Sequence, residues 1–192
     1  MHFHIIIDHP WQESYTHCVM KAFISGLKNT HSFDCLDLNL ERFNPVMTAE
    51  ELALYSRGKY LDPKVGDYQA RLRRADHLVL LFPIWWAVMP AALKGWLDKV
   101  LLPGFAFTVE KAPKPLLTSI KGATILTTTA VSDEYHRSEF HNALDWVLSK
   151  GTLNFCGIEP VTWLNFGEAG VAGRERHNVW LNKVKQYAAN LL

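Results

Sequence analysis

Five apolar runs alternate along the chain with stretches that have the spacing of amphipathic helices, and this alternation limits the fold more than any other feature. The runs read as strands; they cover residues 2–8, 31–38, 77–84, 122–130 and 159–166. The third, HLVLLFPI, is apolar throughout, as expected for a central parallel strand that is covered on both faces. Repeated strand–helix pairs predict a parallel sheet with right-handed crossovers and helices on both faces.

The helical stretches between the strands support the same α/β class. Residues 90–101, 138–149 and 172–191 have helical spacing, while residues 47–75 read as a polar loop and an irregular helical stretch. In the helix at 90–101, Lys94, Asp98 and Lys99 are available to face water. The inward positions are expected to be Tyr15, Val19, Ala22, Phe23 and Leu27; Leu93, Trp96, Leu97 and Val100; Phe140, Leu144, Val147 and Leu148; and Trp180, Val184, Tyr187, Ala188 and Leu191. The pattern predicts a single domain over residues 1–192, with five strands in the order 2-1-3-4-5.

Charge and cysteine usage narrow the partners that such a domain can have. The 20 Lys and Arg residues nearly balance the 19 Asp and Glu residues, which argues against a nucleic-acid or anionic-membrane surface. Cys18, Cys35 and Cys156 lack the spacing of metal ligands, so we expect buried reduced thiols and no metal site. The apolar runs at 2–8 and 78–93 are too short for a signal peptide or a membrane span, which predicts a cytoplasmic protein.

The loop after the first strand carries donors that suit a phosphate. Ligands of such sheets bind beyond the carboxyl ends of the strands, where the strand order reverses. The stretch DHPWQESYTHCVM has neither a GxGxxG motif nor a P-loop, but it places Ser14, Tyr15 and Thr16 at a helix start, with His9 shortly before them. Free N–H groups and the positive end of the helix dipole can hold a phosphate there. Ser14 acting only as a helix cap explains the local sequence equally well.

The loops after the third and fourth strands add flat apolar surface and proton-handling groups. Trp85 and Trp86 can form a ligand wall or, alternatively, serve as core or interface aromatics. Tyr135 and His141 stand six residues apart, although such residues alone are usually ordinary surface or core residues. The small side chains of the last loop, which allow close backbone approach, are Thr127, Thr128, Thr129 and Ala130. Together the three loops suit a phosphorylated, planar aromatic cofactor such as flavin mononucleotide (FMN).

These stretches resemble the flavodoxin-like NAD(P)H:quinone oxidoreductases, a DT-diaphorase-like family. Its bacterial branch includes the ancillary quinone reductases of glutathione-gated potassium efflux systems and the modulators of drug activity. The resemblance covers nearly the whole chain and is most specific in FPIWWAVMPAALKGWLDKVLLPGFAF; LNFCGIEP at 153–160 matches a second family pattern. It implies a flavodoxin-like three-layer sandwich and a flavin-dependent, two-electron, ping-pong reduction of quinones or similar acceptors by NAD(P)H.

The resemblance also implies roles for residues of the three loops. Thr16 stands where the family usually has Asn, and Thr129 and Ala130 stand where it often has two glycines. Tyr135 and His141 keep the family's Tyr-x₅-His spacing and are implied to be catalytic, because a neutral phenol–imidazole pair can stabilise charge on a reduced flavin. The implied cofactor contacts are His9, Ser14, Tyr15 and Thr16; Pro83, Ile84, Trp85, Trp86 and Ala87; and Thr127, Thr128, Thr129 and Ala130.

Several finer points follow from the same resemblance. FMN is the favoured cofactor, with FAD as the alternative and NAD(P)H as co-substrate. A homodimer is expected, with the turn after the third strand and residues 90–101 at its interface. The connection at 103–121 is shorter than in the mammalian members and lacks the tyrosines that reach the partner's site, so a different substrate shape is expected.

Two other functions stay open from sequence alone. A redox-sensing subunit that docks on a potassium efflux transporter at the inner membrane would bind the same cofactors. A flavodoxin-like electron carrier would dock through an acidic face, which the near-neutral net charge argues against.

Overall fold

The sheet has the predicted strand order. The computed structural model describes residues 1–191, and its strands are β1 (His2–Ile7), β2 (Ser32–Asp37), β3 (His77–Pro83), β4 (Ala123–Thr128) and β5 (Val161–Phe166). All neighbours pair in parallel in the order β2-β1-β3-β4-β5. The flavodoxin-like prediction is therefore confirmed, and the strand order reverses between β1 and β3.

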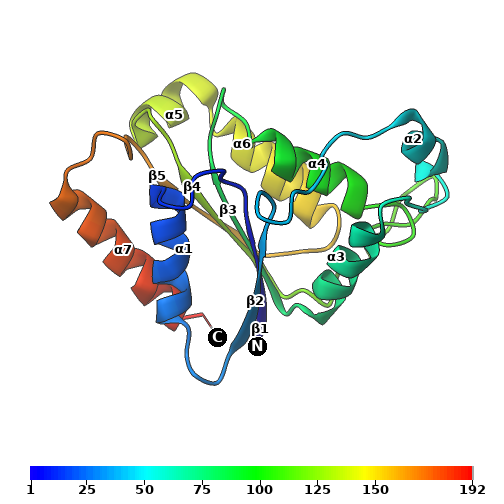
Figure 1. Cartoon of the computed structure of the whole chain (residues 1–192), viewed down its shortest axis with the longest axis horizontal. Coiled ribbons are helices and arrows are strands. Elements are labelled where there is room, and N and C mark those ends of the chain that lie inside the picture. Colours follow the sequence, from blue (N-terminus) through cyan, green and yellow to red (C-terminus); the bar gives the residue numbers. More distant parts are fainter. Residues whose placement is uncertain (192) are drawn as a thin grey trace.

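Helices cover both faces of the sheet (Figure 1). One face carries α1 (Tyr15–Gly26) and α7 (Arg174–Ala189); the other carries α3 (Pro63–Arg74), α4 (Ala91–Val100), α6 (Ala143–Asp145) and the π-helical segment η1 (Trp146–Asn154). Two further helices, α2 (Ala49–Tyr55) and α5 (Asp133–Phe140), lie outside these two layers. Gly26 lets α1 approach α7 closely, because a Cβ there would overlap the main chain of Lys185.

The central strand shows why its sequence is apolar throughout. All seven residues of β3 are buried, and successive side chains of a strand point to opposite faces. Leu78, Leu80 and Phe82 join the core under α3 and α4, whereas Val79 and Leu81 join the core under α1 and α7. Neither face of β3 therefore needs polar residues.

Three local predictions were wrong in whole or in part. Lys99 does not face water: it is buried, and its Nζ lies 2.8 Å from Glu51 Oε1 because α2 folds across α4. Of the three thiols expected to be buried, only Cys156 is buried, whereas Cys18 and Cys35 are exposed.

The continuous helix expected at 138–149 is interrupted, because His141 and Asn142 both adopt left-handed backbone conformations, with φ of 48° and 54°. The break leaves Phe140 and Val147 exposed, while Leu144 and Leu148 are buried as expected.

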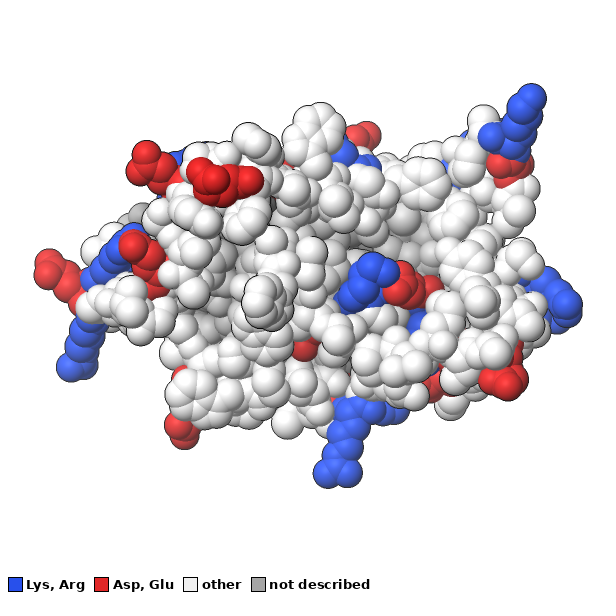
Figure 2. All heavy atoms as spheres, turned by 90° about the horizontal axis from the view of Figure 1, so that it is seen from above, with Lys and Arg blue, Asp and Glu red and all other residues white. Residues whose placement is uncertain are grey.

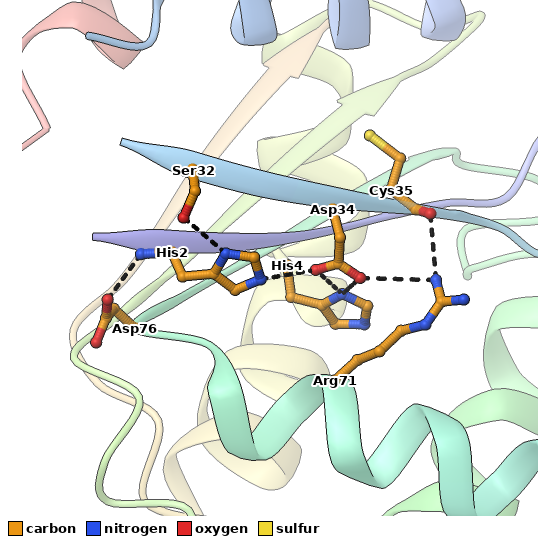
Figure 3. Close-up of polar contacts among 7 residues, drawn as sticks. All are labelled: His2, His4, Ser32, Asp34, Cys35, Arg71 and Asp76. Atoms are coloured by element: carbon orange, nitrogen blue, oxygen red, sulfur yellow. Dashed lines mark hydrogen bonds and ion pairs between the residues drawn. The ribbon is translucent and has the colours of Figure 1, made fainter. Parts of the chain in front are cut away.

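A polar cluster lies between α3 and the face of β1 and β2 (Figure 3). His2 Nε2 and His4 Nδ1 lie 3.1 and 3.0 Å from Asp34 Oδ1, and Arg71 of α3 lies 3.6 Å from Asp34 Oδ2. Burial acts to raise the pKa of Asp34, but the hydrogen bond from His4 and the charges of His4 and Arg71 outweigh it and lower that pKa. This cluster joins β1, β2 and α3 and shares no residue with the pocket described below.

Within residues 1–191, the structure contains no helix with both the length and the apolar character needed to cross a bilayer.

Candidate functional site

A pocket of about 400 Å³ opens at the carboxyl edge of the sheet, where the strand order reverses. It is bordered by the loops after β1, β3, β4 and β5, at the top of Figure 1. Its lining residues are His9, Trp11, Ser14, Tyr15, Thr16, Pro83, Ile84, Trp85, Thr128, Thr129, Ala130, Ala169 and Gly170. Figure 2, which views the molecule from this side, shows mostly uncharged surface with scattered charges of both signs.

The first wall of the pocket is the beginning of α1. Ser14 is its N-cap and accepts a hydrogen bond from the His17 N–H at 3.3 Å. A helix start leaves its first N–H groups without intrahelical acceptors, so those of Tyr15 and Thr16 are available beside the pocket. No acidic residue lies in this first turn. This arrangement is the one with which helix N-termini bind anions in other proteins.

A buried chain of side chains holds Ser14 in place. The Ser14 hydroxyl lies 3.0 Å from His17 Nδ1, and His17 Nε2 lies 3.3 Å from Asp37 Oδ2 at the end of β2. Burial acts to raise the pKa of Asp37, but hydrogen bonds from Gln12, Leu40 and His17 outweigh it and lower that pKa. The carboxylate therefore stays charged at neutral pH and fixes the imidazole against Ser14.

His9 presents a free donor at the mouth of the pocket. Its Nδ1 accepts from the Trp11 N–H at 3.1 Å, so the proton of the neutral ring resides on Nε2. Burial and the nearby His17 lower the pKa of His9, although Asp8 opposes them. The ring meets Trp85 edge to face, with 6.0 Å between centroids. His9 is thus a neutral donor that also braces the aromatic wall.

Hydrogen bonds between the loops make the pocket a single unit. Thr16 Oγ1 lies 3.1 Å from Thr128 Oγ1, and the Ile84 N–H donates to the Thr128 carbonyl at 2.8 Å. The Ala169 N–H donates to the Thr129 carbonyl at 2.9 Å, which attaches the loop after β5. A shift of one loop would therefore disturb the others.

The aromatic wall lies on a tight turn. Trp85 and Val88 exchange two backbone hydrogen bonds, of 3.0 and 3.1 Å, around Trp86 and Ala87, which have positive φ of 51° and 63°. Two positive φ values are the pattern of a type I′ turn, which usually takes Asn and Gly. Strained turns of this kind concentrate at functional sites. Here the turn directs the Trp85 ring into the pocket.

Asp8, which follows β1, stabilises the start of the helix that comes after that turn. The residue before α4 is Pro90, which has no side-chain acceptor to cap the helix. The buried Asp8 carboxylate replaces it: Oδ2 accepts the Leu93 N–H at 2.6 Å, and Oδ1 accepts from Asn39 Nδ2 at 2.9 Å. Burial raises the pKa of Asp8, and these hydrogen bonds oppose the rise. The end of β1 is thereby attached to the start of α4.

Comparison with known proteins places the chain in a family. A family model described as having a flavodoxin-like fold matches residues 1–191. The chain belongs to this flavodoxin-like family. An uncharacterized NAD(P)H oxidoreductase of Haemophilus influenzae is 33% identical over 69% of this chain and 65% of its own length. The NAD(P)H dehydrogenase (quinone) 1 of Cavia porcellus is 26% identical over 81% of this chain and 64% of its own length.

A solved structure agrees over the whole flavodoxin-like chain. The NAD(P)H:quinone oxidoreductase from Methanothermobacter marburgensis superimposes with a TM-score of 0.90 at 26% identity, covering 99% of this chain and 96% of that one. The names of these relatives confirm the family resemblance that the FPIWWAVMPAALKGWLDKV stretch indicated. The chain spans just under two thirds of the length of the two curated relatives.

Most of the predicted contact residues of this flavodoxin-like protein lie around one pocket. Ten line it: His9, Ser14, Tyr15, Thr16, Pro83, Ile84, Trp85, Thr128, Thr129 and Ala130. Thr129 and Ala130 do not have positive φ, so the backbone there does not require the glycines that are common in the family. Their contacts with a cofactor stay predictions.

Five predicted residues lie outside the pocket lining. Trp86 is 98% exposed at the tip of its turn, next to Ala87, and Thr127 is buried with its hydroxyl paired to Asn165 and Trp163. Tyr135 lies on α5, 48% exposed, and His141 ends that helix. The structure gives no hydrogen bond between Tyr135 and His141 within residues 1–191, and their catalytic role stays a prediction.

Three lining residues were missed by the sequence reasoning. Trp11 belongs to the first loop and was passed over in favour of its polar neighbours. Ala169 and Gly170 follow β5 and reach the pocket because the loop after β5 hydrogen-bonds to the loop after β4. The predicted parallel sheet could have indicated Ala169 and Gly170, because in such a sheet every loop that follows a strand lies at the same edge.

The pocket fits a flavin mononucleotide. The first N–H groups of α1 and the Thr16 hydroxyl lie on one wall, and the Trp85 indole lies on another. Tyr15, which also lines the pocket, packs against His177 of α7. Its hydroxyl donates to the His177 carbonyl at 3.1 Å, and its ring stacks on His177 with 4.1 Å between centroids. Burial raises the Tyr15 pKa, so the phenol stays neutral and adds no charge that would repel a phosphate.

Proposed function

We propose that the chain is an FMN-dependent NAD(P)H:quinone oxidoreductase. The observation that carries the proposal is the pocket itself, in which a capped helix start and a flat indole face one cavity at the switch point of the sheet. Such a place suits a phosphate joined to a planar ring. The names of the relatives support the activity.

In this proposal, the residues of the pocket have the following roles. Thr16 and the first N–H groups of α1 hold the phosphate, Ser14 orders that helix start as its N-cap, and His9 donates from Nε2. Trp85 and the backbone after β3 flank the ring. When bound, FMN supplies hydride transfer from NAD(P)H and two-electron reduction of a quinone. Nicotinamide and quinone would use the same open side of the pocket in turn, as in a ping-pong cycle.

The purified protein should be yellow and should bind one FMN per chain. It should oxidise NADH or NADPH with menadione as acceptor and without any added partner. Absorption spectra, mass spectrometry of the released cofactor and steady-state assays test this. A protein that binds neither FMN nor FAD on titration contradicts the proposal. Turnover only in the presence of a transporter-containing membrane would favour the regulatory-subunit alternative.

Ser14→Ala should weaken FMN binding by roughly 2–30-fold, because it removes the N-cap that orders the phosphate-holding N–H groups of α1, and an N-cap is worth roughly 0.5–2 kcal/mol. Riboflavin, which lacks the phosphate, should bind wild type and variant with similar affinity. Fluorescence titration with both ligands measures this difference. Ser25→Ala, on the exposed end of α1, is the matched control. An equal loss for riboflavin would show that the helix start does not hold a phosphate.

His141→Ala should lower kcat with NADPH and menadione by about 100-fold, the low end of the general acid–base range, with FMN affinity unchanged. A left-handed backbone at a non-glycine residue, as at His141, is typical of functional positions. Steady-state and rapid-mixing kinetics measure the change. His2→Ala, at the amino end of β1 and outside the pocket lining, is a control. Wild-type rates in His141→Ala would remove it from the mechanism.

The exposed indole of Trp86 favours a homodimer. A 98% exposed Trp beside the exposed Val88 forms an apolar projection next to the pocket. A homodimer that covers this turn and α4 stays a prediction, as does docking to a potassium efflux transporter.

A further inference from the structure

A second cavity lies on the outer side of β5, and it shares no lining residue with the flavin pocket. We call it the α5–α7 cavity, because its walls come from α5, β5, α7 and Asn142. Figure 1 shows α5 and α7 on the side of the molecule where β5 is the edge strand. Its volume of about 330 Å³ is near the lower end for ligand pockets, which suits a compound with a single ring.

A buried histidine without a partner lines this cavity. His136 is 2% exposed, and neither ring nitrogen has a hydrogen-bond partner within residues 1–191. Phe140 and Trp163 hold the ring, each edge-on with 5.5 Å between centroids. Burial lowers the His136 pKa, although Asp133 opposes the effect, so the ring is neutral and has one donor and one acceptor. Protein atoms enclose both nitrogens, so the ring borders the cavity as an uncharged, apolar edge.

Two cations from different helices border the same cavity. Arg137 of α5 and Lys183 of α7 both line it, and neither forms an ion pair in the part of the chain that the structure describes. The one acidic lining residue, Asp133, already accepts from Asn165 Nδ2 at 2.6 Å. A guanidinium matches a carboxylate in a two-pronged geometry. The charge distribution therefore favours an organic anion.

The remaining wall is apolar and fixed. Trp163, Phe166 and Trp180 line the cavity, and the Trp163 indole is held by its Nε1–H donating to Thr127 Oγ1 at 2.8 Å. Because the Phe166 carbonyl accepts from β4, the parallel ladder directs the main chain of Asn165 away from the sheet. An aromatic ring would find flat apolar contacts here, with a backbone N–H of the edge strand nearby.

We propose that the α5–α7 cavity is a second ligand site that binds a small aromatic carboxylate. Arg137 and Lys183 bind the carboxylate, and the indoles of Trp163 and Trp180 border the ring. The site is separate from the flavin pocket and does not depend on the proposed oxidoreductase activity.

Calorimetric titration with benzoate, with and without FMN, tests the proposal. We expect saturable binding in both cases, with the uncharged benzamide binding more weakly. Arg137→Gln and Lys183→Gln should each weaken benzoate binding by roughly 10-fold, the effect expected for a charge-assisted hydrogen bond. Lys185→Gln, an exposed lysine of α7 outside the cavity, is the matched control.

Three outcomes would overturn the proposal: no saturable binding, unchanged affinity in both Arg137→Gln and Lys183→Gln, or displacement of FMN by the ligand. The last result would place the compound in the flavin pocket. Since binding is measured with and without FMN, a failure of the flavin proposal would leave this test intact.

Discussion

Replacing Trp96 with alanine should lower the free energy of unfolding by about 3–5 kcal/mol, the usual cost of removing a buried Trp or Phe side chain. Trp96 is 0% exposed and belongs to the core between α4 and the sheet. Its removal leaves a cavity, because the surrounding residues of β3 and α4 are held by their own backbone hydrogen bonds. Denaturant unfolding followed by circular dichroism measures the loss. Trp86→Ala, ten residues earlier and 98% exposed, is the matched control and should change stability little.

Trp96→Phe separates the effect of the buried ring volume from the effect of the indole N–H. Nε1 of Trp96 is buried without a hydrogen-bond partner within residues 1–191, and a buried unpaired donor costs free energy. Phenylalanine keeps most of the ring and removes that N–H, so Trp96→Phe should be far less destabilising than Trp96→Ala. An equally large loss in both variants would mean that the indole N–H has a partner and contributes to stability.

The fold was predictable because its signals are local. An apolar run such as HLVLLFPI requires burial on both faces, and only a central parallel strand between two helix layers provides it. The inward residues of α4, Leu93 and Trp96 among them, follow from helical spacing alone. Lys99 was misplaced because its burial depends on Glu51, which is distant in the sequence and belongs to α2. Sequence spacing contains no information on which helix folds across another.

The part of the site that could be predicted is the set of residues that directly follow the strands. Ser14 and Thr128 were expected near each other because parallel strands end at one edge, and their loops line one pocket. The separate positions of Trp85 and Trp86 could not be predicted, since they depend on a turn with positive φ at residues that are not glycine. The support that Asp37 gives Ser14 through His17 connects the end of β2 to the start of α1, about 20 residues apart in the sequence. No spacing in the sequence indicates such a contact.

His77 should make the protein unstable in mild acid. It is buried at the start of β3, with Nε2 2.8 Å from Thr124 Oγ1, and burial lowers its pKa from 6.5 to about 4. The unfolded chain takes up this proton near pH 6.5, while the folded chain resists it until about pH 4. Stability from this group is therefore present at neutral pH and is lost as the pH falls through that window. Between about pH 7.5 and about pH 4.5 the loss should be about 2.5 kcal/mol.

His77→Phe isolates this contribution. Phenylalanine cannot bind a proton, fits beside the ring of Phe3, which lies 5.3 Å from His77, and leaves the Thr124 hydroxyl its bond to Tyr187. Urea unfolding of both proteins across that pH range gives the difference in slope. Asp34 and Asp37, whose lowered pKa values also weaken the fold in acid, and Asp8, whose raised pKa acts in the opposite sense, contribute equally to both proteins. We expect the variant to lose about 2.5 kcal/mol less than wild type on acidification. Parallel curves would show that His77 is protonated in the folded protein as readily as in the unfolded chain.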